Sequence, residues 1–483
     1  MQLPHTRPVA SAIFDDPNLV STAGLAPVMA LARQCDLAEL ADEHLSVPTD
    51  KGANAGLKVG SVVAGMVAGA DSIADMALLR HGAMKTLFDR PYAPSTVGSF
   101  LREFTFGHVR QLDAVASRFL CRLAEHTPIV AGIDTERVLV DIDDSIIEVH
   151  GHSKQGSSYG YSGVRGLNSL ITTLTTSTTA PVIVGQRLRK GSCGSSRGAA
   201  RMIADTLTTV GRIRAAVAIP AATSSNRVEP QPMPKPLVRA DSAFFGYPTI
   251  GAAVRGGADV SITTGLNSVI RTAISAIPDD AWTPIEYTHA IFDEQTQRWI
   301  SVAEVAEIPF TAFASQKKAH HIHGRLIVRR IPDLRPQKDQ GQRQLFDVWR
   351  FHAFFTTTDP AALGTVTADK IHRRHAIIEQ VHADLKNSAL AHLPSSRFTA
   401  NAAWLVCAVM AFNLTRAAAT LTADPKLVKA TTGTIRRTVI SVPARIAYSA
   451  RKLTLHLPTD WPWTKPWMTL FESMFHRNTP ITT

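Results

Sequence analysis

Cysteine is scarce in this sequence, and the few cysteines form no pattern. The four cysteines, Cys35, Cys121, Cys193 and Cys407, are scattered, with no C-x-x-C pair and no cluster of cysteine with histidine. Such spacing predicts neither a disulfide framework nor a structural zinc site. The scarcity of cysteine is typical of a protein that stays in the reducing cytoplasm.

Long apolar segments are also lacking. The first residues, MQLPHTRPVASAIFDDP, contain no continuous apolar core and therefore do not predict a secretory signal. The most apolar run, residues 400–414, is shorter than the about 20 apolar residues that a membrane-spanning helix needs. We expect a buried helix there, and no membrane-spanning segment.

Acidic residues are outnumbered by basic ones. The chain has 51 Lys and Arg against 40 Asp and Glu, which gives a formal net charge of +11. A large basic protein typically meets a polyanion such as DNA, RNA or an anionic membrane surface, although charge can also serve solubility alone. Basic residues greatly exceed acidic ones in the segment 423–483, which is also rich in Trp and Pro.

The pattern of apolar residues changes several times along the chain. At 483 residues the chain exceeds the usual size of one domain core. Three-to-four spacing predicts a helical domain over 1–133, and aliphatic runs alternating with helical patterns predict an α/β core over 134–278. Aromatic and β-branched runs predict a β-rich segment over 279–359. Helical patterns return over 360–422, and a basic tail follows over 423–483.

Three carboxylates interrupt the first aliphatic run, RVLVDIDDS. A buried charge without a partner is costly, so acids at these positions need an explanation. Side chains on a strand alternate between faces, so Asp141 and Asp143 share one face and Asp144 points to the other. Ligands of α/β sheets usually bind at the carboxyl ends of strands. The acids are candidates for such a site, or they cap a polar turn.

A second aspartate, Asp241, follows the aliphatic run LVRA. It lies at the end of another predicted strand and is followed by aromatic residues and Gly246. Two interpretations are open. Asp241 is either a second carboxylate at the same edge of the sheet or the N-cap of the next helix.

A third acid, Glu379, lies in the amphipathic stretch HRRHAIIEQVHADLKN. Three-to-four spacing places His375, Glu379, His382 and Lys386 on one helical face. On its own, this pattern equally describes an exposed polar stripe. Together with the two strand-end aspartates, Glu379 completes a set of three oxygen donors suited to Mg²⁺. Two such ions about 4 Å apart can cleave a phosphodiester.

The stretches VDIDDSIIEVHG, KQGSSYGYSGVRGLNSL, RADSAFFG and HRRHAIIEQVHADLKN, in this order, resemble the DDE transposases of bacterial insertion sequences. The resemblance extends most closely to the insertion-sequence family numbered 1380 and covers the chain to about residue 420. It implies an α/β fold with a ribonuclease H-like mixed-sheet core, a helical N-terminal domain and a β-rich insertion domain over 279–359. Asp143, Asp241 and Glu379 are then the metal ligands and catalytic acids, together with Lys386. Asp141 is the alternative first ligand.

The resemblance also implies partners and cofactors. Two Mg²⁺ ions, with Mn²⁺ able to substitute, would serve strand cleavage and strand transfer. The partners would be double-stranded DNA, namely terminal inverted repeats bound by the front domain and target DNA, in a synaptic complex containing a homodimer. The place of action would be the nucleoid in the bacterial cytoplasm. Residues expected to contact DNA are Arg373, Arg374 and Trp299, unless Trp299 only fills the core of the β-rich segment. The composition of the stretch 154–168 adds Lys154 and Arg165 as candidate DNA contacts, with a long hairpin loop as the open alternative.

One departure from the family pattern concerns the start of the last stretch. Related transposases often have Tyr and Arg seven and four residues before the glutamate, where this sequence has His372 and His375. Two alternative functions remain open on the same core. One is a structure-specific nuclease without strand transfer, and the other is a catalytically inactive, transposase-derived DNA-binding protein.

Overall fold

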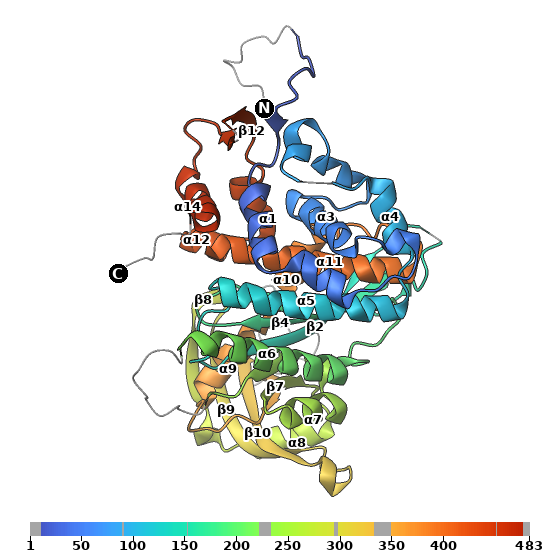
Figure 1. Ribbon diagram of the computed structural model, residues 1–483. Helices are drawn as coiled ribbons and strands as arrows, with labels where there is room; N and C mark the ends of the chain where they lie inside the picture. The colour runs from blue at the N-terminus through green and yellow to red at the C-terminus, as the bar shows by residue number, and fades with distance from the viewer. Residues whose placement is uncertain are drawn as a thin grey trace.

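The computed structural model describes residues 11–88, 91–151, 153–221, 233–293, 298–332, 349–450 and 452–476 (Figure 1). Helices and a large mixed sheet make up most of this part of the chain. The predicted α/β class is therefore confirmed. The ribonuclease H-like arrangement and the domain boundaries stay predictions.

The sheet has ten strands in the order β3-β4-β2-β6-β7-β11-β10-β9-β8, with β5 paired to β4 on the side that β3 also uses. Only the pairs β2–β6 and β6–β7 are parallel. The strands are β2 (Leu139–Glu148), β3 (Ser158–Tyr159), β4 (Arg165–Thr175), β5 (Val182–Lys190), β6 (Leu237–Ala240), β7 (Asp259–Thr264), β8 (Thr283–Asp293), β9 (Arg298–Ala312), β10 (Ile322–Pro332) and β11 (Trp349–Thr356).

The β-rich segment continues this same sheet. Strand β11 pairs with β7 in antiparallel register, and β10, β9 and β8 follow outward from it. Its inner face is apolar, with Leu326, Val328 and Ala353 buried against α8 (Ser268–Ser275). The segment therefore extends the core sheet edge to edge.

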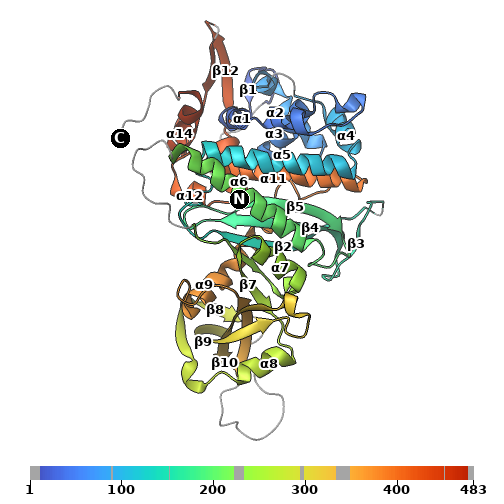
Figure 2. The same cartoon turned by 60° about the horizontal axis from the view of Figure 1, so that its bottom comes forward.

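Three long helices cover one face of the sheet, as Figure 2 shows: α5 (Phe106–His126), α6 (Ala199–Ala221) and α11 (Phe398–Thr420). The hydroxyl groups of Thr172 on β4 and Thr206 on α6 lie 2.6 Å apart in a hydrogen bond. Asn413 of α11 accepts from the Ile183 amide at 2.9 Å and donates to the Ile183 carbonyl at 2.7 Å. The two bonds to Asn413 satisfy backbone groups of the edge strand β5.

The opposite face of β2 contacts a shorter helix, α10 (Ile377–Lys386), which follows α9 (Thr365–Arg373). Buried Ile378, Val381 and Leu385 anchor α10 to the core. This apolar side fixes the helix, and its polar side is left to meet the acidic side chains of β2.

The helices of the front segment and the end of the chain pack together. Strand β1 (Leu19–Val20) pairs with β12 (Ala444–Ser449), and α1 (Leu25–Gln34) contacts α14 (Thr464–Phe475). Much of the basic tail is thus folded onto the front helices. The remaining elements here are α2 (Leu37–His44), α3 (Ala55–Ala68), α4 (Pro94–Arg102), α12 (Pro425–Val428), α13 (Thr432–Ile435) and β13 (Lys452–His456).

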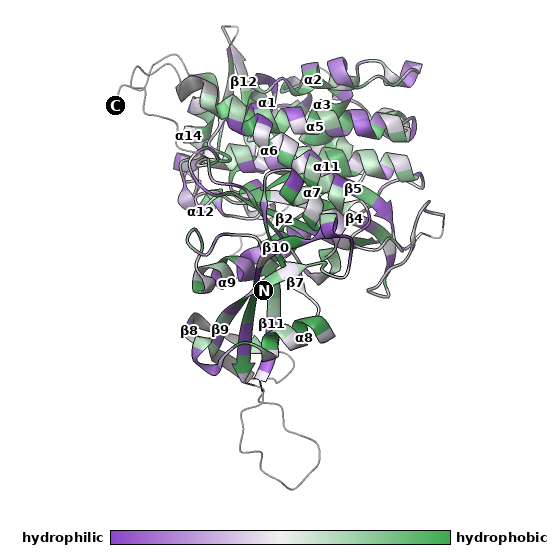
Figure 3. Cartoon of the chain, turned by 90° about the horizontal axis from the view of Figure 1, so that it is seen from below, coloured by the Kyte–Doolittle hydropathy of each residue, from purple (hydrophilic) through white to green (hydrophobic). Residues whose placement is uncertain are grey.

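Helix α11 forms the centre of the core. Trp404 is fully buried and donates its indole N–H to the Ala389 carbonyl at 2.7 Å. In the described part of the chain α11 is the one helix long and apolar enough to cross a membrane, but its apolar window is 100% buried. Figure 3 colours it mainly from white to green, and other elements surround it. The predicted buried helix is confirmed.

Candidate active site

The register between β2 and β6 brings two aspartates to the same level of the sheet. Asp141 pairs with Arg239 across the two parallel strands. The pairing ends at these two residues, and Asp241 follows the last residue of β6. Asp241 is close enough to Asp143 for its charge to raise the pKa of the Asp143 carboxyl. The two predicted strand-end aspartates therefore lie near each other.

Asp143 lies half-buried on the face of β2 that meets α10. Burial raises the pKa of its carboxyl to about 7, and Asp241 and Asp144 add to this rise, while the Asp144 amide and His375 act against it. Its nearest basic group is Nε2 of His382, at 3.9 Å from Oδ2. A divalent cation would supply the positive charge that favours the ionised carboxylate.

Asp241 is exposed and begins the 3₁₀ turn η4 (Ser242–Phe244). Its Oδ1 accepts the amide N–H of Ala243 at 3.0 Å, so the N-cap interpretation is correct for this oxygen. Partial desolvation raises the pKa of Asp241 despite the backbone amides. The cap fixes the carboxylate at the end of β6, beside Asp143.

Asp141 has a different environment from Asp143. It is fully buried, and Arg239 donates to both of its oxygens at 2.7 Å. Nδ1 of His375 lies 3.0 Å from Oδ1. Burial raises the pKa of Asp141, but Arg239 and His375 outweigh burial and hold it below the usual value. Both oxygens of Asp141 are thus already engaged by cationic or polar side chains.

Asp144 points to the opposite face, as alternation along the strand predicts. It accepts a hydrogen bond from Nη2 of Arg189 at 2.8 Å and another from Nδ2 of Asn168. Arg189 also donates to three carbonyls of the loop that precedes α6. Asp144 is therefore part of a buried structural network that fixes this loop.

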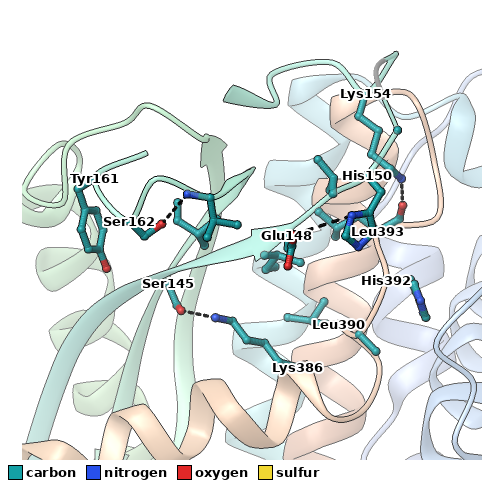
Figure 4. Close-up of a pocket in the computed structure, with 16 residues that line it drawn as sticks. Ser145, Glu148, His150, Lys154, Tyr161, Ser162, Lys386, Leu390, His392 and Leu393 are labelled. Atoms are coloured by element: carbon teal, nitrogen blue, oxygen red, sulfur yellow. Dashed lines mark hydrogen bonds and ion pairs between the residues drawn. The ribbon is translucent and has the colours of Figure 1, made fainter. Parts of the chain in front are cut away.

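Helix α10 presents two polar side chains to the Asp143 face. Nζ of Lys386 donates to Oγ of Ser145 at 2.6 Å, which Figure 4 shows. Burial lowers the pKa of Lys386, while Asp143 acts to raise it. His382 is buried, burial lowers its pKa to about 4, and its Nε2 has no hydrogen-bond partner. Lys386 thus reaches the strand of the first aspartate.

Glu379 lies in the first turn of α10 and is exposed. It shares a helical face with His382 and Lys386 but sits at the solvent-exposed margin of that face. Within the described residues no three His, Cys, Asp or Glu side chains are grouped so that they could hold a metal ion. The structure therefore brings Asp143 and Asp241 together and leaves the Glu379 carboxylate apart from them.

The two histidines that depart from the family pattern have structural partners. His372 stacks on Phe354 with ring centroids 4.0 Å apart, and its two nitrogens bond the hydroxyls of Ser261 and Thr263 at 2.9 and 3.0 Å. Burial lowers the pKa of His372 to about 3, so the ring is neutral. His375 is held by Asp141, as described above.

Most of the residues expected to contact DNA have intramolecular partners. Lys154 donates to the carbonyls of Leu393 and Ser395. Arg165 donates to the Gly151 carbonyl at 3.2 Å and Ser157 Oγ at 3.0 Å, and Arg373 pairs with Asp369 at 2.8 Å. The Arg374 side chain is exposed and has no such partner among the described residues. The side chain of Trp299 lies outside the part that the structure describes.

A cavity of about 620 Å³ opens next to this cluster, at the carboxyl end of β2. It lies between the hairpin that carries Tyr161 and the C-terminal end of α10, with Ser145 and Lys386 in its wall (Figure 4). Burial and the negative charges of Asp144, Asp143 and Asp241 raise the pKa of the Tyr161 hydroxyl. Neither Asp143 nor Asp241 is part of the cavity wall, which begins two residues beyond Asp143, at Ser145.

Sequence reasoning missed Arg239 and His382. The sequence does contain a hint for Arg239, because Arg239 precedes Asp241 by two residues, just as Asp141 precedes Asp143. Pairing these four residues required the register of β2 against β6.

A search for known relatives gave one family. The sequence model of the family described as Transposase DDE domain group 1 matches residues 4–479, nearly the whole chain. No curated protein matches the chain.

Proposed function

The chain belongs to the family of DDE transposase domains, group 1, and we propose from this premise that it cuts and joins DNA with a metal site built on Asp143 and Asp241. The transposase would bind terminal inverted repeats, cleave them and join the freed 3′ ends to target DNA. One observation carries this proposal. The charges of Asp143 and Asp241 interact, and among the described residues no arginine or lysine lies within ion-pair distance of Asp143, whereas Asp141, two residues earlier on β2, is paired with Arg239.

The donor set at this edge of the sheet fits a hard divalent ion. Carboxylate oxygens are the ligands that Mg²⁺ prefers, and Asp143 and Asp241 offer them from adjacent strand ends. Mg²⁺ there, or Mn²⁺ in its place, would activate a water or a 3′ hydroxyl and stabilise the leaving oxygen. Asp143 would release its proton when the cation binds, because the cation favours the ionised form.

We assign the third ligand to Glu379 and a supporting role to Lys386. Glu379 is on the face of α10 that also carries His382 and Lys386, and both of these reach β2 near Asp143. Lys386 holds Ser145 and, like Lys154, lines the large cavity, where it can orient a phosphate oxygen. Asp141, with both oxygens engaged, serves as a support for His375.

The remaining parts of the proposal concern DNA. The front helices would bind the transposon ends, and two copies of the chain would hold two ends in one synaptic complex. Arg374 is a good candidate for a phosphate contact because it is exposed just before α10. Lys154, Arg165, Arg373 and Trp299 are proposed as additional contacts. Membership of the insertion-sequence family numbered 1380 is part of the same proposal, on the motifs in the sequence.

The proposal is tested by DNA cleavage with Glu379→Gln. The substrate is DNA from either side of the coding sequence, where matched inverted repeats are expected. In Mg²⁺ the wild type should nick this DNA, and E379Q should not. Glu286→Gln, an exposed glutamate on the outer strand β8, is the matched control and should nick normally. Full activity of E379Q would remove Glu379 from the site.

A second assay separates a transposase from a nuclease. Precut ends with a 3′ hydroxyl are supplied together with a supercoiled target plasmid. A transposase joins the ends to the plasmid, whereas a structure-specific nuclease does not. Binding of DNA without cleavage or joining under any Mg²⁺ concentration would instead identify an inactive DNA-binding protein.

A further inference from the structure

A second polar cavity lies on the other face of the sheet. It has a volume of about 230 Å³ and is enclosed by α5, α6 and the edge strand β5. Figure 2 shows α5 and α6 above this end of the sheet. Because Asp143 faces α10 on the opposite side, this cavity does not belong to the site described above.

Positive charge dominates the wall of this cavity. Four arginines line it, with two aspartates among them: Arg110, Arg118, Arg187, Arg212, Asp113 and Asp205. Both aspartates already have partners. Arg110 donates to Asp113 at 2.7 Å and contacts Asp205 at 3.5 Å. Gln186 also donates to Asp113, and Arg201 to Asp205, both at 2.8 Å. The other three arginines are left as an excess of positive charge.

These three arginines lack anionic partners of their own at hydrogen-bond distance. The Nε of Arg187 is buried and has no hydrogen-bond partner. Arg118 donates to the Ala114 carbonyl at 3.2 Å, and Arg212 is exposed without a hydrogen bond or ion pair in the described part of the chain. Burial lowers the pKa of Arg187 and the positive charge of Arg110 adds to this effect, although the charges of Asp113 and Asp205 partly oppose it. A buried donor without an acceptor is costly, so an external anion would relieve it.

The backbone of β5 is shaped to place these groups. Gly185 pairs with Thr172 and Ile183 with Thr173, so β5 has a bulge at Val184. A bulge changes which side chains face a given side of the sheet. Beyond it Arg187 points to the face covered by α5 and α6. A Cβ at Gly185 would lie 2.6 Å from Sδ of Met202 on α6, so glycine permits this close approach.

We propose that this cavity binds a phosphate group of the DNA backbone. A guanidinium group matches a phosphate oxygen pair with two parallel N–H donors, and three such groups converge here from α5, β5 and α6. Ser117 and Thr209, whose hydroxyls lie 3.0 Å apart in the same wall, add neutral donors. The identification of the anion as DNA rests on the proposed function. The duplex segment bound here would be distinct from the one cleaved at Asp143.

The test is DNA binding by the double variant Arg118→Gln/Arg212→Gln of the full chain. A labelled duplex carrying the flanking sequence is titrated by fluorescence anisotropy in EDTA at several salt concentrations. Affinity should fall about tenfold at low salt, and the slope of log affinity against log salt should fall by about one per lost phosphate contact. The control, Arg255→Gln/Arg271→Gln, removes two exposed helical arginines elsewhere.

Three results would overturn the proposal. The first is an equal loss in the cavity variant and the control, which would reflect net charge alone. The second is an unchanged salt slope. The third is a double variant that binds DNA as well as the wild type but, unlike the wild type, is not stabilised by inorganic phosphate. That result would assign the cavity to free phosphate. If the double variant fails to fold, Arg212→Gln alone carries the test because this side chain is exposed. The assay contains no metal, so failure of the catalytic proposal would not affect it.

Discussion

Strand β2 carries an aspartate at two successive positions of one face, Asp141 and Asp143, and the two have different surroundings. We call the position of Asp141 the lower rung of the sheet and the position of Asp143 the upper rung. In the lower rung Asp141 pairs with Arg239, fully buried, with two bonds of 2.7 Å. In the upper rung burial raises the pKa of Asp143, and the charge of nearby Asp241 adds to this rise. Among the described residues no arginine or lysine pairs with Asp143. An arginine on the adjacent strand makes Asp141 part of a structural ion pair, whereas Asp143, without one, is left as a carboxylate that a cation would stabilise.

The largest expected effect is a loss of DNA nicking on substitution of the upper-rung aspartate or of Asp241. Asp143→Asn or Asp241→Asn should reduce DNA nicking in Mg²⁺ at least about a thousandfold, because several kcal/mol of metal-dependent stabilisation is lost. The fold should persist, because among the described residues neither carboxylate has a close basic partner that the substitution would leave unpaired. The nearest such atom to Asp143 is Nε2 of His382, at 3.9 Å. Nicking rates and melting temperatures are measured together. Near-normal nicking by both variants would contradict the assignment.

The next effect concerns stability and the lower rung. Arg239→Gln leaves the Asp141 carboxylate buried without its partner, which should cost about 3–5 kcal/mol of unfolding free energy. Urea denaturation measures the loss. Adding Asp141→Asn to this variant should recover part of it, because the uncompensated charge is removed. An additive double variant would show that the two residues do not act as a pair.

A pH dependence should distinguish the rungs in the metal-free protein. The pKa of Asp143 is about 7 in the folded state against 3.8 as its ordinary value. Between these pH values the folded state binds the extra proton, so this carboxyl makes stability fall as pH rises from about 4 to 7. The contribution should be about 2–4 kcal/mol. Asp143→Asn should remove it, and Mg²⁺ should reduce it; an unchanged pH profile in this variant would argue against the buried carboxyl.

The smallest effect tests how Lys386 acts. Ser145→Ala removes one charge-assisted hydrogen bond and should cost about 1–3 kcal/mol of stability with modest loss of nicking. Lys386→Met removes the same bond together with the cation beside the large cavity. If Lys386 orients a phosphate, K386M should lower nicking about tenfold further than S145A. Equal rates for the two variants would limit Lys386 to holding Ser145.

Sequence patterns predicted the fold class, the buried helix around Trp404 and the separation of Asp144 from its two neighbours. These depend on local periodicity, which the sequence carries directly. Arg239 as partner of Asp141 depends on register between strands almost a hundred residues apart, and His382 beside Asp143 depends on how α10 docks. Packing of α14 against α1 likewise joins the two ends of the chain. Such contacts are set by tertiary packing, which no local pattern encodes.

Glu379 is the opposite case, a residue that the sequence singles out more clearly than the structure does. Its motif and spacing single it out in the sequence, yet its carboxylate is exposed at the margin of α10. The motif therefore indicates a role that the observed arrangement of side chains does not display. Metal binding supplies the energy that could bring such a ligand in, since coordination is coupled to local structure.

Metal binding by the upper rung tests the central claim most directly. Mn²⁺ binding to the full chain is measured by electron paramagnetic resonance, with Glu286→Gln as the control. We predict that the wild type and E286Q bind Mn²⁺, that D143N and D241N lose this binding, and that E379Q binds more weakly. Unchanged Mn²⁺ binding by D143N and D241N would contradict the account.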